Sequence, residues 1–213
     1  VLSAFTVGIV DRPAMIGPAR VQDGDVLIGL ASSGLHSNGY SLARKVCTED
    51  KTLYELTIAR DELEGDSVLD ALLEPTRIYV KSIRSVLLQC PGAIHSLAHI
   101  TGGGITENLN RALPSTLDAE IQVGSWNMVP ILPWVCRAAH LNETEALKTF
   151  NMGLGMILAV APQKAEEVAQ LLADAGEEVY IVGQVVPGVG KVVYLDEEEL
   201  FAAYSEDEEA EED

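Results

Sequence analysis

The pattern of apolar and polar positions along this 213-residue chain predicts strands toward both ends and helices between them. Short runs rich in β-branched residues and bounded by turn residues are typical of strands. They occur at residues 4–10, 25–31, 93–100, 118–123, 152–160, 178–186 and 191–195. Apolar residues spaced three and four apart are typical of amphipathic helices. They occur from about residue 38 to 46, in two segments of 67–90, and at 104–113, 129–140, 142–150 and 162–176.

Capping and breaking residues mark the ends of several predicted helices. Pro75 divides 67–90 into two helices, because a proline inside a helix removes a backbone donor. Asn142 precedes an acidic first turn and is a plausible N-cap. Pro162 in the first turn and Gly176 just past the end give the clearest helix of the chain.

The order of these elements predicts the fold class. The last two strands flank the sequence "PGVG", which predicts a hairpin between them. Strands at both ends of the chain with helices between them predict a mixed β-sheet covered by helices, an α+β fold. Since no internal repeat or linker is visible, we predict a single domain over residues 1–204, followed by an acidic tail at 205–213.

Charge is concentrated at the C-terminal end. The net charge is −19, and residues 196–213 contain eleven acidic residues and no basic one. The remainder has 14 basic against 22 acidic residues, so no basic face for nucleic acid is expected. A segment so acidic is typically disordered and solvated, which is our prediction for the tail.

Cysteine use and hydropathy favour a reducing compartment and no membrane span. The three cysteines are widely spaced without a CxxC motif, which predicts buried free thiols, and the four histidines form no zinc-like pairing with them. Apolar runs such as 156–160 are too short to cross a bilayer. No secretory signal opens the sequence. We expect a cytoplasmic protein, or an organellar one if a leader has been removed.

The stretch "AHITGGGITEN" contains a first candidate site. An apolar strand leads into Thr101, Gly102, Gly103 and Gly104, and a predicted helix follows at once. Free amide groups at a helix N-terminus favour an anion, so these residues are candidates for phosphate binding. A tight strand-to-helix turn without a ligand is the alternative. The spacing matches neither the Walker A nor the GxGxxG motif.

The loop "SSGLHSNGYS" at 32–41 is a second candidate. His36 could act as an acid or a base, because the reference pKa of histidine lies near neutrality. Ser37 and Asn38 could bind a polar ligand. A polar turn in which Asn38 caps the following helix is the alternative.

A third candidate is "KTFNMGLGM", in which Asn151 precedes a strand with two glycines. Glycine in a strand can mark a close approach of the backbone to a ligand, but a bulge or tight packing is an equal alternative. No group of acidic residues stands out as a Mg²⁺ site, so we assign no metal ligand in this chain.

Four stretches together resemble a known family: "GDVLIGLASSGLHSNGYSLARKV", "LLEPTRIYVKS", "AHITGGGITENLNRALP" and "KTFNMGLGMILAV". In this order they are similar to the C-terminal half of aminoimidazole ribonucleotide (AIR) synthetase, also called phosphoribosylformylglycinamidine cyclo-ligase. The similarity extends from about residue 4 to 195. The same superfamily includes formylglycinamidine ribonucleotide amidotransferase, selenophosphate synthetase, thiamine-monophosphate kinase and a hydrogenase-maturation protein.

The resemblance implies a function in purine biosynthesis. The family closes formylglycinamidine ribonucleotide to aminoimidazole ribonucleotide with ATP. An N-terminal domain, which has no counterpart here, holds most of the ATP and Mg²⁺ ligands and much of a homodimer interface. The active site lies between the two domains. The residues of this chain that would face it are His36, Ser37, Asn38, His99, Thr101, Gly102, Gly103, Gly104 and Asn151.

Within that implied site, His36 and His99 would be the catalytic residues, and His99 could polarise or deprotonate the substrate. A satisfied strand histidine is the alternative for His99. The resemblance also implies that this chain alone is inactive, because the ATP-binding half is missing. A truncated, non-catalytic binding or assembly module is the alternative function.

Overall fold

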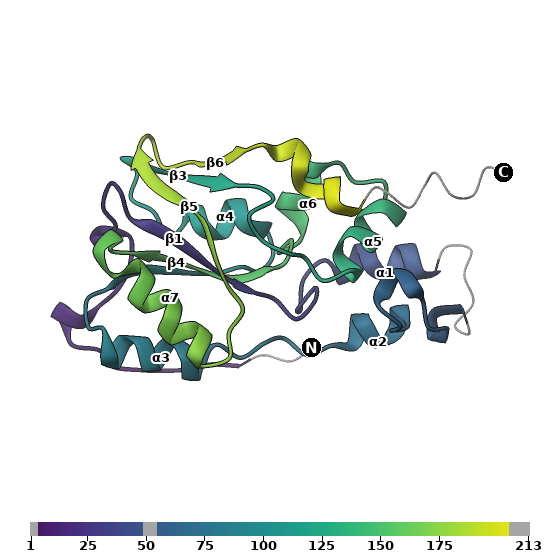
Figure 1. Cartoon of the computed structure of the whole chain (residues 1–213), viewed down its shortest axis with the longest axis horizontal. Coiled ribbons are helices and arrows are strands. Elements are labelled where there is room, and N and C mark those ends of the chain that lie inside the picture. The colour runs from purple at the N-terminus through teal and green to yellow at the C-terminus, as the bar shows by residue number, and fades with distance from the viewer. Residues whose placement is uncertain (1–3, 49–54, 205–213) are drawn as a thin grey trace.

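A six-stranded mixed sheet forms the centre of the computed structural model, which describes residues 4–48 and 55–204 (Figure 1). The strand order is β2-β4-β1-β5-β3-β6. The strands are β1 (Val26–Ala31), β2 (Ile94–His99), β3 (Leu117–Gln122), β4 (Leu154–Val160), β5 (Val179–Pro187) and β6 (Val192–Leu195). Neighbouring strands are antiparallel except β3 and β6, which are parallel.

Seven α-helices surround this sheet within the described residues. They are α1 (Tyr40–Thr48), α2 (Val68–Leu73), α3 (Val80–Gln89), α4 (Gly104–Asn110), α5 (Ile131–Ala138), α6 (Glu143–Thr149) and α7 (Ala165–Asp174). Short 3₁₀ helices lie at Arg12–Ala14, Pro18–Arg20, Glu55–Thr57, Asp61–Leu63, Pro162–Lys164 and Glu197–Tyr204. Helices α3 and α7 lie together on one side of the sheet, and α1, α2 and α5 gather beyond one end of it (Figure 1).

The two faces of the sheet belong to two apolar clusters, because side chains alternate along a strand. On one face, Ile28 of β1 and Leu158 of β4 pack with Val86 of α3 and Val168 of α7. On the opposite face, the larger of the two clusters joins the sheet to α4 and α6 and continues to α5 at the end of the sheet. Both β1 and β4 are buried on both faces except at the half-buried Val26 and Met156, which explains their nearly continuous apolar sequences.

Most of the predicted elements are confirmed. Residues 74–79, around Pro75, have no helical structure and separate α2 from α3. Asn142 caps α6, accepting a hydrogen bond from Glu145 N, and the Glu145 side chain completes a capping box. The three cysteines are free and buried, as predicted. The acidic tail at 205–213 lies outside the described residues.

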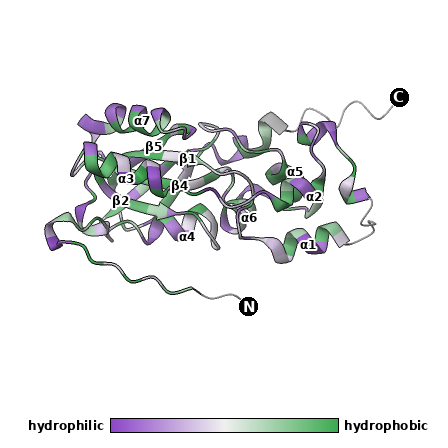
Figure 2. Cartoon of the chain, turned by 90° about the horizontal axis from the view of Figure 1, so that it is seen from below, coloured by the Kyte–Doolittle hydropathy of each residue, from purple (hydrophilic) through white to green (hydrophobic). Residues whose placement is uncertain are grey.

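The predicted strand at 4–10 is wrong for this structure. These residues form no ladder, and the side chains of Phe5, Val7 and Ile9 are 101%, 88% and 102% exposed. In the view of Figure 2 the segment runs apart from the helices. The sequence has the alternation of a strand, but a strand needs a hydrogen-bonding partner, and none of the described strands pairs with it.

The predicted hairpin of the last two strands is also wrong. β5 pairs with β1 and β3, so both of its edges are occupied. β6 instead pairs in parallel with the other edge of β3, with Ala119 opposite Val192. The connecting turn passes the start of β3, where the Asp118 carboxylate accepts hydrogen bonds from Val189 N and Lys191 N. These bonds hold the pKa of Asp118 below its usual value.

No described helix is both long and apolar enough to span a bilayer.

Candidate functional site

The glycine corner, residues 101–104, turns the chain from β2 into α4. Gly104 N donates to Thr101 O at 3.0 Å, and Gly103 and Gly104 have φ angles of 92° and 62°. This left-handed region is open to glycine at little cost. A Cβ on Gly104 would also lie 2.0 Å from Leu147 O, at the end of α6. Close packing against α6 is therefore enough to explain why the third position of the corner is a glycine, and no ligand is needed to explain it.

Asn108, on the first turns of α4, holds the glycine corner in shape. Its Nδ2 donates to Thr101 O at 3.2 Å, Gly102 O at 3.2 Å and Gly104 O at 2.7 Å. Its Oδ1 accepts from the Thr101 hydroxyl at 3.0 Å and from the Arg111 guanidinium at 2.5 Å. The corner is thus a fixed loop, and the Thr101 proton is already used inside it.

The first two glycines of the corner retain free backbone donors. The N–H groups of Gly102 and Gly103 find no acceptor among the residues that the structure describes. Gly102 is exposed, and a Cβ on it would meet only Asn38 Oδ1, at 3.7 Å. Two unpaired amides, one on the exposed Gly102 and one on the half-buried Gly103, are suited to an anionic oxygen, in line with the predicted phosphate contact.

The polar loop, residues 32–39, follows β1 and lies next to the glycine corner. Asn38 Oδ1 lies 3.7 Å from the position that a Cβ on Gly102 would occupy, so the two predicted sites are adjacent. Ser37 is exposed, and its hydroxyl lies 3.1 Å from that of Thr76. Helix α1 begins after Gly39, whose carbonyl accepts the first helical hydrogen bonds.

His36, by contrast, is buried, with 4% of its surface exposed. Its Nε2 accepts hydrogen bonds from Ser33 N at 3.1 Å and from Arg77 N at 3.4 Å. Burial, His99 and Arg77 together lower the pKa of His36 to about 4, because each disfavours a positive charge on the ring. At neutral pH the ring is uncharged.

His99 is exposed at the end of β2, where two grooves meet. The apolar groove, about 490 Å³, lies between α3 and β2 and is lined mainly by aliphatic side chains such as Ile83 and Leu87. The polar groove, about 410 Å³, is lined by Ser96, Asn108 and Arg111. His99 therefore borders both, in reach of solvent.

Asn151 is fully buried and already bonded within the chain. Its Oδ1 accepts from Ser32 Oγ at 3.2 Å and from Gly153 N at 3.0 Å, and its Nδ2 donates to Gly34 O at 2.9 Å. The geometry supports a positioning role, in which Asn151 ties the polar loop to the start of β4. Direct ligand contact remains only a prediction from the resemblance.

Replacing Asn151 by alanine is expected to lower the free energy of unfolding by about 3 kcal/mol, because a buried carbonyl and a buried amide lose their partners. Urea unfolding would measure the loss. Asn110→Ala, at an exposed position at the end of α4, is the control and should change stability by less than about 0.5 kcal/mol. Equal stability of Asn151→Ala and the wild type would contradict this role.

Sequence reasoning missed two residues that shape the site. Asn108 lies in the glycine-rich stretch but was given no role there, and Arg77 lies outside both candidate loops. An asparagine within a short helix is unfavourable by propensity alone, which is a local signal that it has another role. Arg77 lies in "LLEPTRIYVKS", a stretch that carried the resemblance without an assigned function.

The fold and the two adjacent loops define a class of protein: an α+β domain in which a polar loop and a glycine corner follow β1 and β2, the two strands that flank β4 in a mixed sheet. Solved structures with this fold include thiamine-monophosphate kinase from Stenotrophomonas maltophilia, with a TM-score of 0.57 and 16% identity over 87% of this chain and 54% of that one. A HypE–HypF complex gives a TM-score of 0.54 and 15% identity over 82% and 50%. At such identities they show the fold alone.

The chain belongs to the AIR synthase related proteins, whose C-terminal domain matches residues 22–196. It is 49% identical over 193 residues to a phosphoribosylformylglycinamidine cyclo-ligase of Brevibacillus brevis, covering 91% of this chain and 55% of that protein. A cyclo-ligase of Bacillus cytotoxicus is 45% identical, covering 89% and 53%. The resemblance inferred from the sequence is confirmed. The chain spans about half the length of the curated relatives it matches.

Proposed function

We propose that this chain is the C-terminal part of a phosphoribosylformylglycinamidine cyclo-ligase, which closes formylglycinamidine ribonucleotide to aminoimidazole ribonucleotide with ATP. The observation that carries the proposal is 45–49% identity to cyclo-ligases over 89–91% of the chain. The site is consistent with this activity, because phosphoryl transfer depends on anion binding and positioning more than on covalent catalysis.

In the proposed reaction, ATP phosphorylates the formyl oxygen, the amidine nitrogen attacks the same carbon, and phosphate leaves. The amides of Gly102 and Gly103 would hold an anionic oxygen of the phosphorylated substrate. Asn38, beside Gly102, and the exposed Ser37 would contact its polar groups. His99 is the exposed histidine of the pair, so it is the better candidate to exchange a proton with the substrate.

The residues described here do not fit a Mg²⁺ site. Among them, no three His, Cys, Asp or Glu side chains lie close enough together to hold a metal ion. We infer that ATP and Mg²⁺ are bound mainly by an N-terminal domain, as the resemblance implies, and that the full-length protein is a cytoplasmic homodimer.

A chimera tests the proposal. This chain would replace the matching C-terminal part of the Brevibacillus brevis cyclo-ligase, and conversion of formylglycinamidine ribonucleotide with ATP would be followed by mass spectrometry. We expect product from the chimera and none from the isolated chain, because the ATP-binding part is then missing.

The truncated Brevibacillus enzyme without this replacement is the control and should form no product. Ring closure at the full rate by the isolated chain would disprove the dependence on an N-terminal domain. A folded chimera without activity would favour a non-catalytic binding or assembly module instead.

A further inference from the structure

The strap, residues 74–79 between α2 and α3, is bound to the polar loop at successive points. The Ser33 hydroxyl donates to Pro75 O at 2.7 Å, and the hydroxyls of Ser37 and Thr76 lie 3.1 Å apart. Further along the strap, Arg77 N donates a hydrogen bond to His36 Nε2. The strap therefore determines where the polar loop lies, although no function was assigned to this stretch of sequence.

A clasp centred on Arg77 fixes the strap from its other side. Arg77 Nε donates to Glu177 Oε2 at 2.7 Å, and Arg77 Nη2 donates to Gly176 O at 2.6 Å. The Ser82 hydroxyl donates to the second oxygen of Glu177 at 2.5 Å. The Glu177 side chain is only 6% exposed, so this carboxylate is nearly enclosed by its donors. Charge-assisted bonds of this kind hold geometry tightly.

The hydrogen bonds to His36 select one tautomer of its ring. Nε2 accepts from Ser33 N and Arg77 N, and a ring nitrogen that accepts carries no proton. The proton of the neutral ring is then on Nδ1. Nδ1 is buried and has no partner in the part of the chain that the structure describes. A buried donor without an acceptor is costly, and a bound ligand could supply the acceptor.

We propose that Arg77 is a positioning residue: its clasp to Glu177 holds the strap so that His36 keeps its proton on Nδ1 and donates it in a hydrogen bond to a ligand acceptor. His36 then does not act as a general base, which revises the role predicted from the sequence. Only the ligand contact rests on the proposed function; the tautomer is a property of this chain alone.

Other neighbours of His36 are consistent with this assignment. His99 and Arg77 both disfavour a charged ring, and Glu177 is already engaged by Arg77. The Tyr79 ring lies 6.3 Å from the His36 ring between centroids, and its hydroxyl donates to Ala31 O at 2.7 Å. Burial raises the pKa of Tyr79, so this hydroxyl stays protonated. None of these neighbours therefore offers a free negative charge that would stabilise a protonated His36 ring.

The tautomer can be measured on the full chain with ¹⁵N-labelled histidine, because protonated and unprotonated ring nitrogens have well-separated chemical shifts. We expect Nδ1 of His36 to be protonated and Nε2 unprotonated, unchanged from pH 8 to pH 5. A proton on Nε2, or titration at the ordinary histidine pKa near 6.5, would overturn the proposal.

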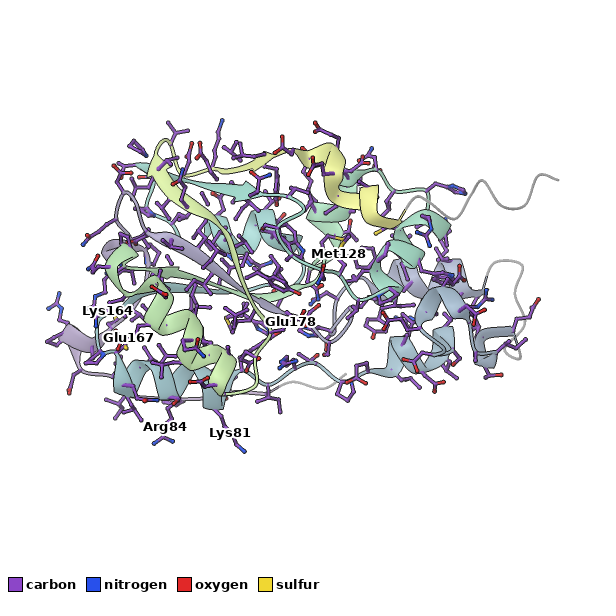
Figure 3. All side chains as sticks on the ribbon, in the orientation of Figure 1. Lys81, Arg84, Met128, Lys164, Glu167 and Glu178 are labelled. Atoms are coloured by element: carbon purple, nitrogen blue, oxygen red, sulfur yellow. The ribbon has the colours of Figure 1, made fainter. Side chains whose placement is uncertain are left out.

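Arg77→Ala tests the clasp. We expect mixed ring-nitrogen shifts and a His36 pKa displaced toward its ordinary value. Arg84→Ala is the matched control, because Arg84 also borders the apolar groove but points outward from α3 (Figure 3). If Arg77→Ala unfolds, Arg77→Lys is the alternative. Lysine keeps the charge but lacks the planar guanidinium that donates to both Glu177 and Gly176, so it should give a smaller change in the His36 ring-nitrogen shifts. Unchanged His36 shifts in a folded Arg77 variant would overturn the proposal.

His36→Gln in the chimera tests the ligand contact. The glutamine side chain can still accept a hydrogen bond near the position of Nε2, but it has no donor at the position of Nδ1. We expect kcat/KM to fall at least about tenfold, as for a lost hydrogen bond to a ligand. The pH profile of the unmodified chimera should show no ionisation from His36 above about pH 5, and Arg77→Ala should introduce one. An inactive chimera would count against the proposed function, while the ring-nitrogen measurement would still decide the tautomer.

Discussion

Gly104→Ala is expected to lower the free energy of unfolding by about 3–5 kcal/mol, the largest effect of any substitution in the glycine corner. The φ angle of 62° alone disfavours a side chain by about 1 kcal/mol. The larger part comes from contact, because the new Cβ would lie 2.0 Å from Leu147 O and 2.8 Å from Leu147 C. These are backbone atoms at the end of α6, so α4 and α6 must separate. Urea unfolding would measure the effect.

Gly92→Ala separates the two causes. Gly92 has a φ angle of 82°, but a Cβ there would meet no atom within 4 Å. It should cost about 1 kcal/mol, the backbone contribution alone. Gly102→Ala, with a Cβ 3.7 Å from Asn38 Oδ1, should cost no more than that. If Gly104→Ala were as stable as Gly92→Ala, the close packing of α4 on α6 would be wrong.

Asn108→Asp is expected to lower the free energy of unfolding by about 3 kcal/mol at neutral pH, although the two side chains have the same shape. The substitution replaces an amide that donates to three carbonyl oxygens by a carboxylate oxygen that faces them. Each carbonyl loses its bond from Asn108, although Thr101 O still accepts from Gly104 N, and a negative charge meets three partial negative charges. Arg111, already bonded to Oδ1, offsets part of the loss.

This destabilisation should depend on pH. The carbonyl oxygens raise the pKa of the introduced carboxyl in the folded chain, so the loss is full above that pKa. As the pH falls through it, a protonated carboxyl can again donate to one carbonyl, and the difference from the wild type shrinks. Urea unfolding of both proteins at neutral and acidic pH would show this.

Asn110→Asp is the control for charge, since Asn110 is exposed at the end of the same helix. A carboxylate near a helix C-terminus costs only a few tenths of a kcal/mol. If Asn108→Asp and Asn110→Asp were equally stable, Asn108 would not organise the glycine corner. In the chimera, Asn108→Asp should also weaken substrate binding, because the Gly102 and Gly103 amides would no longer be held in place.

The sequence by itself determined the elements whose causes are local. Asn142 caps α6 through bonds within one turn, and Pro162 with Gly176 brackets α7, so neighbouring residues suffice to predict them. The same holds for the buried strands β1 and β4, whose apolar runs reflect burial on both faces. The four stretches quoted in the sequence analysis also identified the family. Such a resemblance needs only matching residues in the right order, without knowledge of which residues meet in the fold.

Only the tertiary structure decided which residues far apart in the sequence pair with one another. Residues 4–10 have a strand pattern but no pairing edge, and β6 joins β3 because both edges of β5 are occupied. The tautomer of His36 depends on an amide 41 residues away in the sequence. A strand edge pairs with one neighbour, and a hydrogen-bonding group can serve only a few partners. A one-dimensional pattern does not show which partners these will be.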